Sequence, residues 1–367
     1  MPGRRDFLKA GLTLSAWAGL AHMPWAWGKV PEGEPLLLSA VDDARGRHCL
    51  AGATAQGELA FISQVPERCH GGTRRPGLGE VVMFARRPGR HFHVVNTATG
   101  KKQLSVAASE GRHFYGHGVF SPDGRHLYAT ANRFESAEGI VQVFDAEEDY
   151  RLVKELPLDG IGPHELRLHP DGETLIVALG GIETHPDYGR VKLNLDSMAP
   201  ALLLMNRHSG EIHARHAPSH HQLSCRHLDL APDGTVILGY QFQGPEWETP
   251  PLIARLDGKR GEFRELALSE FLTPKLRNYI ASIAVSRDGR RAAVTAPRGN
   301  RVLILDTRDG RLLNESGLED AAGVVAHGDG FLVSSGRGGL YRLSSEASTP
   351  QRLTTLPLHW DNHLTLA

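Results

Sequence analysis

A short turn recurs five times along this chain, each time between two stretches in which apolar and polar residues alternate. The copies are Phe120-Ser-Pro-Asp-Gly124, Leu168-His-Pro-Asp-Gly172, Leu230-Ala-Pro-Asp-Gly234, Val285-Ser-Arg-Asp-Gly289 and Ala326-His-Gly-Asp-Gly330. Alternation is typical of strands, and Gly adopts the positive φ of a tight turn at little cost. Each copy therefore predicts a hairpin of two antiparallel strands.

A second turn, in which Asn or Asp is followed four residues later by Gly, recurs between these hairpins. It occurs at Asn96/Gly100, Asn206/Gly210, Asp257/Gly261 and Asp306/Gly310, and Asp145 has Asp149 in place of the Gly. Successive Asp-Gly turns are 48, 62, 55 and 41 residues apart. Two alternating turns at such intervals predict a repeated four-stranded sheet, which is the unit of a β-propeller.

The number of blades follows from the two ends of the chain. The segments 36–41, 48–53 and 58–64 predict three strands with no inner strand before them, whereas Asn362–Ala367 matches Arg226–Ala231 position by position and has no strand after it. We therefore expect an all-β, seven-bladed propeller (WD40/YVTN-like) whose first blade is closed by the C-terminal strand, because closure removes an open sheet edge. The alternative is six blades with a loose C-terminal tail.

Composition limits the classes of partner. The net charge is −1 and the pI is about 7.1, which implies no basic face and argues against nucleic acid as a partner. Beyond residue 28 no stretch of about 20 apolar residues offers a membrane span. The oligomeric state is left open by the sequence.

The N-terminus carries a targeting signal. Arg4-Arg5-Asp6-Phe7-Leu8-Lys9 matches the twin-arginine consensus, and an apolar run over residues 10–20 and Ala26-Trp27-Gly28 follow it. The alternative is an accidental basic start on an amphipathic helix. We expect residues 1–28 to be a signal peptide, residues 29–367 to be a single propeller domain, and the protein to reach the periplasm already folded.

The chain contains three cysteines, Cys49, Cys69 and Cys225, which allow one disulfide at most. We expect Cys49 to be buried as a small apolar residue. Cys69 and Cys225 are expected to lie too far apart across the channel to form a disulfide. None of them belongs to a Cys-x-x-Cys-His motif, so a covalent haem is excluded.

Strand order predicts which face carries function. In a four-stranded blade the connection into the inner strand and the loop between the second and third strands emerge on one face, and the Asp-Gly turns lie on the other. Alignment of the turns puts one histidine at the same inner-strand position in several blades; these are His70, His117, His227 and His363. Such a ring of imidazoles could bind a metal or an anion. The alternative is a polar, hydrated channel wall, and Ser282 and Gly323 interrupt the ring.

The fourth blade has the richest loops. Gly160-Ile-Gly-Pro-His-Glu165 enters its inner strand, and Gly180–Arg190 forms its longest insertion on the same face. We expect these segments to meet and to form a metal site from His164, Glu165, Glu183, His185 and Asp187. Imidazoles and carboxylates suit iron, manganese or zinc, or acid-base chemistry. The alternative is a solvated loop. Asn132, Arg190 and Arg226 are expected to bind a ligand at the same mouth.

Several of these motifs together resemble a known bacterial family. The order of a twin-arginine signal, His117-Gly-Val-Phe-Ser-Pro-Asp-Gly124, Gly160–Leu166, Gly180–Arg190 and Leu193-Asn-Leu-Asp-Ser-Met198 is similar to the family catalogued as domain of unknown function 1513. The resemblance covers nearly the whole mature chain. It implies an exported propeller encoded in iron-regulated clusters beside imelysin-like proteins and di-haem oxidoreductases, but no family activity is established and it supplies no catalytic residues.

Three functions remain open from the sequence. The first is a periplasmic binding or accessory protein of iron acquisition that holds a ligand or a divalent metal, iron or copper, at the channel mouth and meets periplasmic partners of that cluster. The second is a lactonase-like hydrolase, which Gly162-Pro-His-Glu-Leu166 partly resembles. The third is a docking platform without catalysis. The absence of a nucleophile elbow and of a phosphate loop argues against covalent hydrolysis and nucleotide chemistry.

Overall fold

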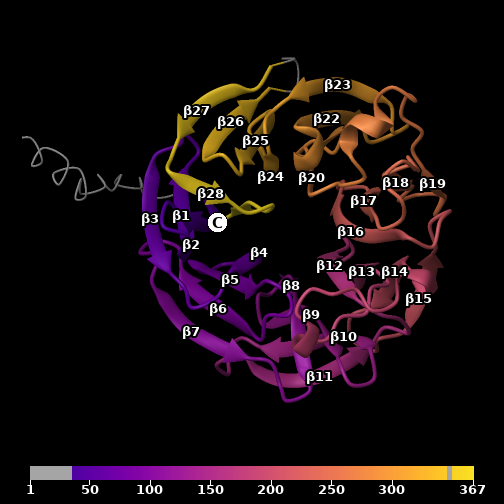
Figure 1. The fold of residues 1–367 in the computed structure, drawn as a ribbon. Coiled ribbons are helices and arrows are strands. Elements are labelled where there is room, and N and C mark those ends of the chain that lie inside the picture. Colours follow the sequence, from indigo (N-terminus) through magenta and orange to yellow (C-terminus); the bar gives the residue numbers. More distant parts are fainter. Residues whose placement is uncertain (1–34, 345–348) are drawn as a thin grey trace, which may run out of the picture.

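The computed structural model describes residues 35–344 and 349–367, and in them seven antiparallel sheets form a closed ring (Figure 1). Six sheets have four strands, and the first has five. Counting outward from the axis, we name the positions A to D. The seven-bladed propeller predicted from the turns is therefore confirmed. The predicted signal peptide lies outside the described residues.

The strands follow the predicted order closely. The first blade contains β28 (Leu358–Trp360), β29 (Thr365–Leu366), β1 (Leu36–Asp43), β2 (His48–Thr54) and β3 (Leu59–Gln64). The second and third contain β4 (Cys69–Arg74), β5 (Glu80–Ala85), β6 (His91–Asn96), β7 (Lys102–Ala107), β8 (Arg112–Phe120), β9 (His126–Arg133), β10 (Glu138–Asp145) and β11 (Arg151–Pro157). The fourth and fifth contain β12 (Pro163–Leu168), β13 (Thr174–Leu179), β14 (Ala201–Asn206), β15 (Ile212–His216), β16 (Leu223–Leu230), β17 (Val236–Phe242), β18 (Ile253–Leu256) and β19 (Phe263–Glu265).

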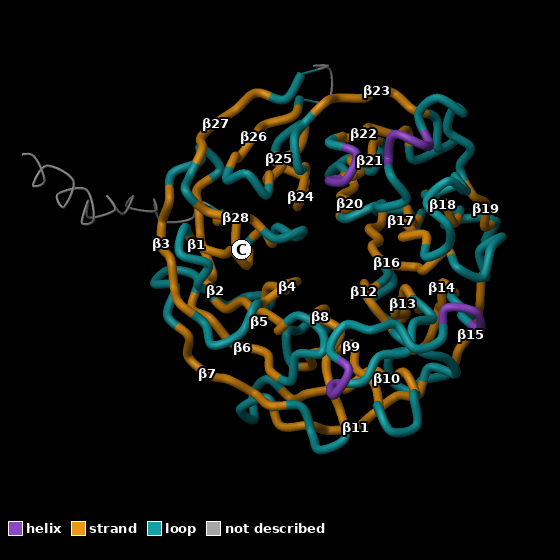
Figure 2. The backbone as a smooth tube through the Cα atoms, in the orientation of Figure 1, coloured by secondary structure: helices purple, strands orange, loops and turns teal. Residues whose placement is uncertain are grey.

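The sixth and seventh blades complete the ring. They contain β20 (Ser282–Val285), β21 (Arg291–Ala296), β22 (Arg301–Asp306), β23 (Leu312–Gly317), β24 (Ala321–His327), β25 (Gly330–Ser335), β26 (Gly339–Leu343) and β27 (Gln351–Thr355). Four short 3-10 helices lie in connections between strands (Figure 2); they are η1 (Pro186–Tyr188), η2 (Leu195–Ser197), η3 (Thr273–Leu276) and η4 (Pro297–Gly299). No helix of the described part is long and apolar enough to cross a bilayer.

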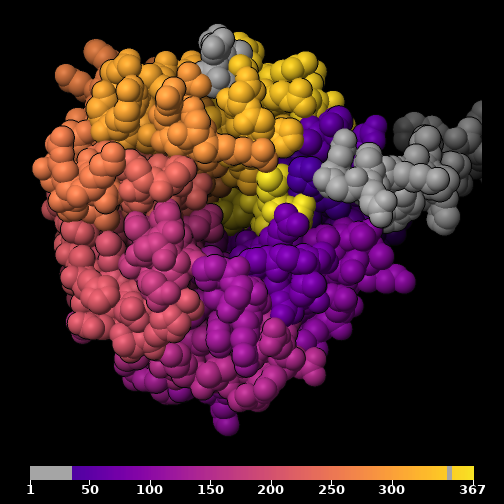
Figure 3. All heavy atoms as spheres, turned by 180° about the vertical axis from the view of Figure 1, so that it is seen from behind, coloured from indigo at the N-terminus to yellow at the C-terminus, as the bar shows by residue number. Residues whose placement is uncertain are grey.

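The C-terminus closes the first blade, as predicted, but in two pieces. β1 pairs with β28, where Val41 lies opposite Trp360, and with β29, where Leu37 lies opposite Leu366. The expected single strand over 362–367 is thus interrupted, because residues between the two pieces leave the ladder and carry His363 into the channel. Figure 3 shows these C-terminal residues, in yellow, reaching the middle of the disc.

The core lies between neighbouring blades. Phe84 and Phe92 of the second blade pack on Phe114 and Phe144 of the third, and the ring centroids of the contacting pairs lie 5.1 to 6.0 Å apart. Comparable buried apolar groups fill the other interfaces between blades. Each sheet therefore depends on its neighbours for burial, which makes ring closure a condition of stability.

The three cysteines are buried and unpaired. Burial raises the pKa of the Cys49 thiol, and it also raises the pKa values of the thiols of Cys69 and Cys225. The expectation that Cys69 and Cys225 do not bridge agrees with this state.

Candidate functional site: a histidine cluster beneath a basic pocket

Five imidazoles gather in the centre of the channel, and all five are buried; they belong to His70, His117, His164, His227 and His363. Their ring centroids lie 4.4 to 6.3 Å apart. Two sets of three have ligand nitrogens within 4.8 Å of one another, and His117 belongs to both sets. We call these five residues the histidine cluster.

An irregularity in the inner strands re-aims these side chains. Pairing between strands A and B shifts between Cys69 and Gly72, Phe114 and Gly118, Pro163 and Glu165, and Cys225 and His227. A bulge breaks the strict alternation of side chains. The neighbours His164 and Glu165 can therefore both reach the channel.

Glycines allow the inner strands to approach one another at the cluster. A Cβ at residue 71 would lie 2.6 Å from Nδ1 of His117, and a Cβ at residue 116 would lie 3.0 Å from Cδ2 of His70. Gly323 has a different reason: a Cβ there would lie 2.5 Å from the backbone nitrogen of Leu364. The interruption of the histidine ring in the seventh blade thus makes room for the returning C-terminal segment.

Two buried carboxylates orient the cluster. Nδ1 of His70 donates to Asp361 at 2.8 Å, and Nδ1 of His227 donates to Glu165 at 2.9 Å. The second nitrogen of each ring, Nε2, then carries the lone pair. Carboxylate-to-histidine contacts of this kind commonly orient metal-binding imidazoles. Nε2 of His117 and Nδ1 of His164 have no hydrogen-bond partner among the described residues.

Burial keeps the imidazoles neutral. It disfavours the protonated form, and together with repulsion from neighbouring cationic groups it holds the pKa values of His117, His164, His227 and His363 well below the usual 6.5. The pKa of His70 is also lowered by burial, although Asp361 opposes the shift. The neutral imidazole is the form that binds metal ions.

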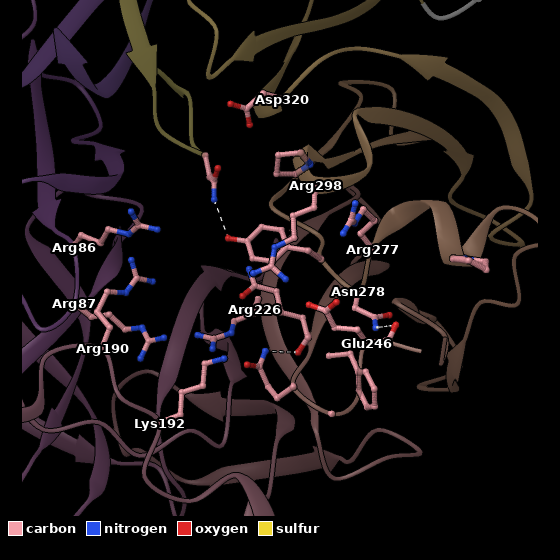
Figure 4. Close-up of a pocket in the computed structure, with 18 residues that line it drawn as sticks. Arg86, Arg87, Arg190, Lys192, Arg226, Glu246, Arg277, Asn278, Arg298 and Asp320 are labelled. Atoms are coloured by element: carbon pink, nitrogen blue, oxygen red, sulfur yellow. Dashed lines mark hydrogen bonds between the residues drawn. The ribbon is translucent and has the colours of Figure 1, made fainter. Parts of the chain in front are cut away.

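A pocket of about 970 Å³ opens above the cluster, on the face predicted from strand order. Its walls come from six blades, mainly from loops between strands B and C and from connections into strand A. Seven of its lining residues are basic, and they are Arg86, Arg87, Arg190, Lys192, Arg226, Arg277 and Arg298. Two lining residues, Glu246 and Asp320, are acidic. We call this hollow the basic pocket; Figure 4 shows its cationic groups extending into one shared space.

A smaller cavity joins the basic pocket to the cluster. Its lining includes Arg87 and Arg226 from the pocket and His164 and His227 from the cluster. Arg226 and Arg87 are buried and form the floor, whereas Arg190, Arg277 and Arg298 are exposed at the rim. The two features are thus parts of one continuous site.

The charges of the basic pocket are poorly compensated. Burial and the nearby Arg87 lower the pKa of Arg226 to about 9. Arg190 and Lys192 are exposed at the rim but partly desolvated by the pocket walls; this desolvation, with the nearby Arg86 and Arg87, lowers the pKa of Arg190 to about 10, and desolvation with Arg226 also lowers the pKa of Lys192. Nε of Arg226 and one terminal nitrogen of Arg87 have no hydrogen-bond partner in the described part of the chain.

The insertion of the fourth blade contributes basic side chains to the basic pocket. Asn194 holds the loop by accepting from the backbone N–H of Glu183 at 2.7 Å and donating to Gly181 O at 2.9 Å. This loop presents Arg190, as predicted, and also Lys192 to the basic pocket.

The structure places the five residues predicted as a metal set in different surroundings. His164 and Glu165 lie buried in the channel. His185 instead packs on Phe134 of the third blade, at 4.9 Å between centroids, and accepts from the N–H of Asp187, whose side chain is 82% exposed. The reason is local: His185 is the N-cap of η1, and its ring lies against Phe134 and Tyr188. Glu183 belongs to neither set of three ligand residues found in the described part of the chain.

The predicted ligand-binding residues mostly converge. His70, His117, His227 and His363 form the cluster with His164, and Arg190 and Arg226 line the pocket. Asn132 is separate: it is buried, and its amide lies 3.5 Å from the Tyr115 hydroxyl.

Sequence reasoning missed several residues of this site. Arg86, Arg87, Arg277 and Arg298 all lie in loops of the predicted functional face, so a count of basic residues in those loops would have found them. Asp361 directly precedes the segment matched to Arg226–Ala231, and no pattern marked it.

Fold and site define a class of protein: a seven-bladed propeller that places buried imidazoles beneath a basic pocket on its axis. The family model described as "Protein of unknown function (DUF1513)" matches residues 63–367, and the chain belongs to that family. Among solved structures, Kuenenia stuttgartiensis hydrazine synthase is similar with a TM-score of 0.60 and 16% sequence identity, over 93% of this chain and 97% of that chain. Identity this low shows the fold alone. No curated protein matches the chain.

Proposed function

We propose that this protein is a periplasmic binding protein of iron acquisition, and that its histidine cluster binds a divalent transition metal, iron or copper. The observation that carries the metal site is the buried set of neutral imidazoles with ligand nitrogens within 4.8 Å of one another. Imidazole suits iron, copper and zinc. The periplasmic and iron-linked setting is supported by the twin-arginine motif and by the family resemblance.

The carboxylates beside the cluster are engaged by basic side chains. The two basic groups nearest to the orienting carboxylates are already paired, since Arg68 lies 2.7 Å from Asp361 and Arg167 lies 2.8 Å from Glu165. Calcium, expected for a lactonase-like hydrolase, takes about six to eight oxygen ligands. With the two carboxylates that contact the cluster, Asp361 and Glu165, engaged by histidines and arginines, the site favours a nitrogen-bound metal over that alternative.

The first test removes the histidine shared by both triads. We expect His117→Ala to weaken binding of Fe(II) or Cu(II) by about 100-fold or more, because loss of one ligand from a small set removes most of the affinity. Isothermal titration of metal-free protein, under anaerobic conditions for Fe(II), measures the change. His93→Ala is the matched control, because His93 is also buried but bonds to Ser105 outside the cluster.

Elemental analysis of protein purified from periplasm gives an independent reading. Bound iron or copper in the wild type and its loss in His117→Ala would support the proposal. Equal metal content in wild type, His117→Ala and His93→Ala would contradict it.

Export should depend on the arginine pair at the N-terminus. Replacing Arg4 and Arg5 by Lys should leave precursor in the cytoplasm, because Lys lacks the planar fork of the guanidinium group. Cell fractionation with immunoblotting measures the distribution. Unimpaired export of the wild type in a strain lacking the twin-arginine translocase would show that another route is used.

A further inference from the structure

The basic pocket holds more positive charge than any structural need of the described residues explains. Arg87, Arg190, Arg226, Arg277 and Arg298 form no ion pair with an acidic side chain in the described ranges. Arg298 instead stacks on the Tyr279 ring, 4.4 Å from its centroid. Arg87 and Arg226 are buried as well as unpaired, and an unpaired buried cation is costly. These residues are therefore arranged for a partner that is not part of the chain.

The arrangement of the cations restricts the partner. In Figure 4, Arg86, Arg87 and Arg190 approach the shared space from one side, and Arg277 and Arg298 approach from the other. Arg226 lies on the floor between them and is 3% exposed. Guanidinium groups match carboxylate and phosphate oxygens through paired hydrogen bonds. Cations on opposite sides suit a ligand with separated negative groups.

The dimensions favour a small molecule. A volume of about 970 Å³ falls within the range of small-molecule pockets, about 300–1,000 Å³. Uncharged donors also line the same space. Gln241 donates one amide hydrogen to Ile280 O and keeps the second, and the Tyr279 hydroxyl accepts from Asn362 and keeps its own hydrogen.

We propose that the basic pocket binds a small polyanion that carries two or more carboxylate or phosphate groups. This site does not depend on the metal function proposed above. The anion supplies the negative charge that compensates the arginines of the floor and the rim. It also occupies the approach to the histidine cluster.

The test compares three probes on metal-free protein by isothermal titration: citrate, inorganic pyrophosphate and acetate. Metal is removed with a chelating resin, because soluble chelators are themselves polyanions. We expect citrate or pyrophosphate to bind at least about tenfold more tightly than acetate, with an affinity that falls as salt rises. Tighter citrate binding assigns carboxylates to the ligand, and tighter pyrophosphate binding assigns phosphates.

Variants separate a binding role from a structural one. Arg226→Gln with Arg87→Gln should reduce the affinity for the tighter probe at least about tenfold and raise the melting temperature of the ligand-free protein, because buried like charges are removed. A purely structural role would lower the melting temperature. Lys259→Gln with Arg260→Gln, in the exposed turn between β18 and β19 on the opposite face, is the control and should change neither quantity.

Two results would overturn the proposal. One is that citrate and pyrophosphate bind no more tightly than acetate. The other is that the floor variant binds the tighter probe as well as the wild type does. Both readings are made without metal, so neither depends on whether the histidine cluster binds iron or copper.

Discussion

A chain that ends at residue 357 should fail to fold cooperatively. The deletion removes β28 and β29, and with them the buried side chains of Leu358, Trp360 and Leu364. Burial of three such side chains contributes about 5–9 kcal/mol at about 1.5–3 kcal/mol each. This is comparable to the whole stability of a typical domain, about 5–15 kcal/mol. Differential scanning calorimetry should therefore show a broad or missing transition.

The deletion should destabilise the protein by opening the ring as well as by removing buried apolar area. Without the two short strands, β1 has an unpaired edge towards the channel, and unpaired edges promote aggregation. A peptide of residues 357–367 added in trans should restore part of the transition, whereas a scrambled peptide should not. A melting curve unchanged by the deletion would show that the C-terminal segment is dispensable for closure.

The metal-free protein should lose stability steeply below about pH 6.5. The cluster histidines are neutral when folded, with lowered pKa values, but become protonated when the chain unfolds. Below pH 6.5 the unfolded state therefore binds more protons than the folded state, so the free energy of unfolding falls as the pH falls. Above pH 6.5 the histidines are neutral in both states and this loss of stability is absent. Each histidine contributes about 1.4 kcal/mol per pH unit while it stays neutral in the folded state.

Urea unfolding at a series of pH values between 7.5 and 4.5 measures this slope. Replacing His117 and His164 together by Gln should reduce the slope below pH 6 by about 2.8 kcal/mol per pH unit, because two protons fewer are taken up on unfolding. His208 and His213, which are exposed, provide the control pair. An identical slope in the His117/His164 variant would show that the cluster is protonated without unfolding.

Much of the architecture could be predicted because it depends on turns that a few neighbouring residues specify. The Asp-Gly and Asn/Asp-to-Gly turns set the strand order, and the strand order set which loops share a face. The shared position of His70, His117, His227 and His363 could be seen once those turns were aligned. The match of Asn362–Ala367 to Arg226–Ala231 predicted closure by the C-terminus.

The residues that make up the candidate site were harder to predict from the sequence. Net charge near zero suggested no basic face, yet seven basic residues line one pocket, because average composition carries no information about placement. His185 and Asp187 lie two residues apart in a loop that was predicted to form a metal site. In the structure His185 caps η1 and packs on Phe134 of the third blade. Only the folded loop shows that Arg190 faces the axis and His185 does not.

The number of blades, the strand order, the face that carries the candidate site and most of the inner-strand histidines can be predicted from the chain alone, because turns and alternation act over a few residues. Which side chains meet depends on the folded molecule. Bulges in the inner strands brought both His164 and Glu165 into the channel, and the returning C-terminus placed Asp361 beside His70. The basic pocket depends on segments from six blades, and their convergence requires the closed ring.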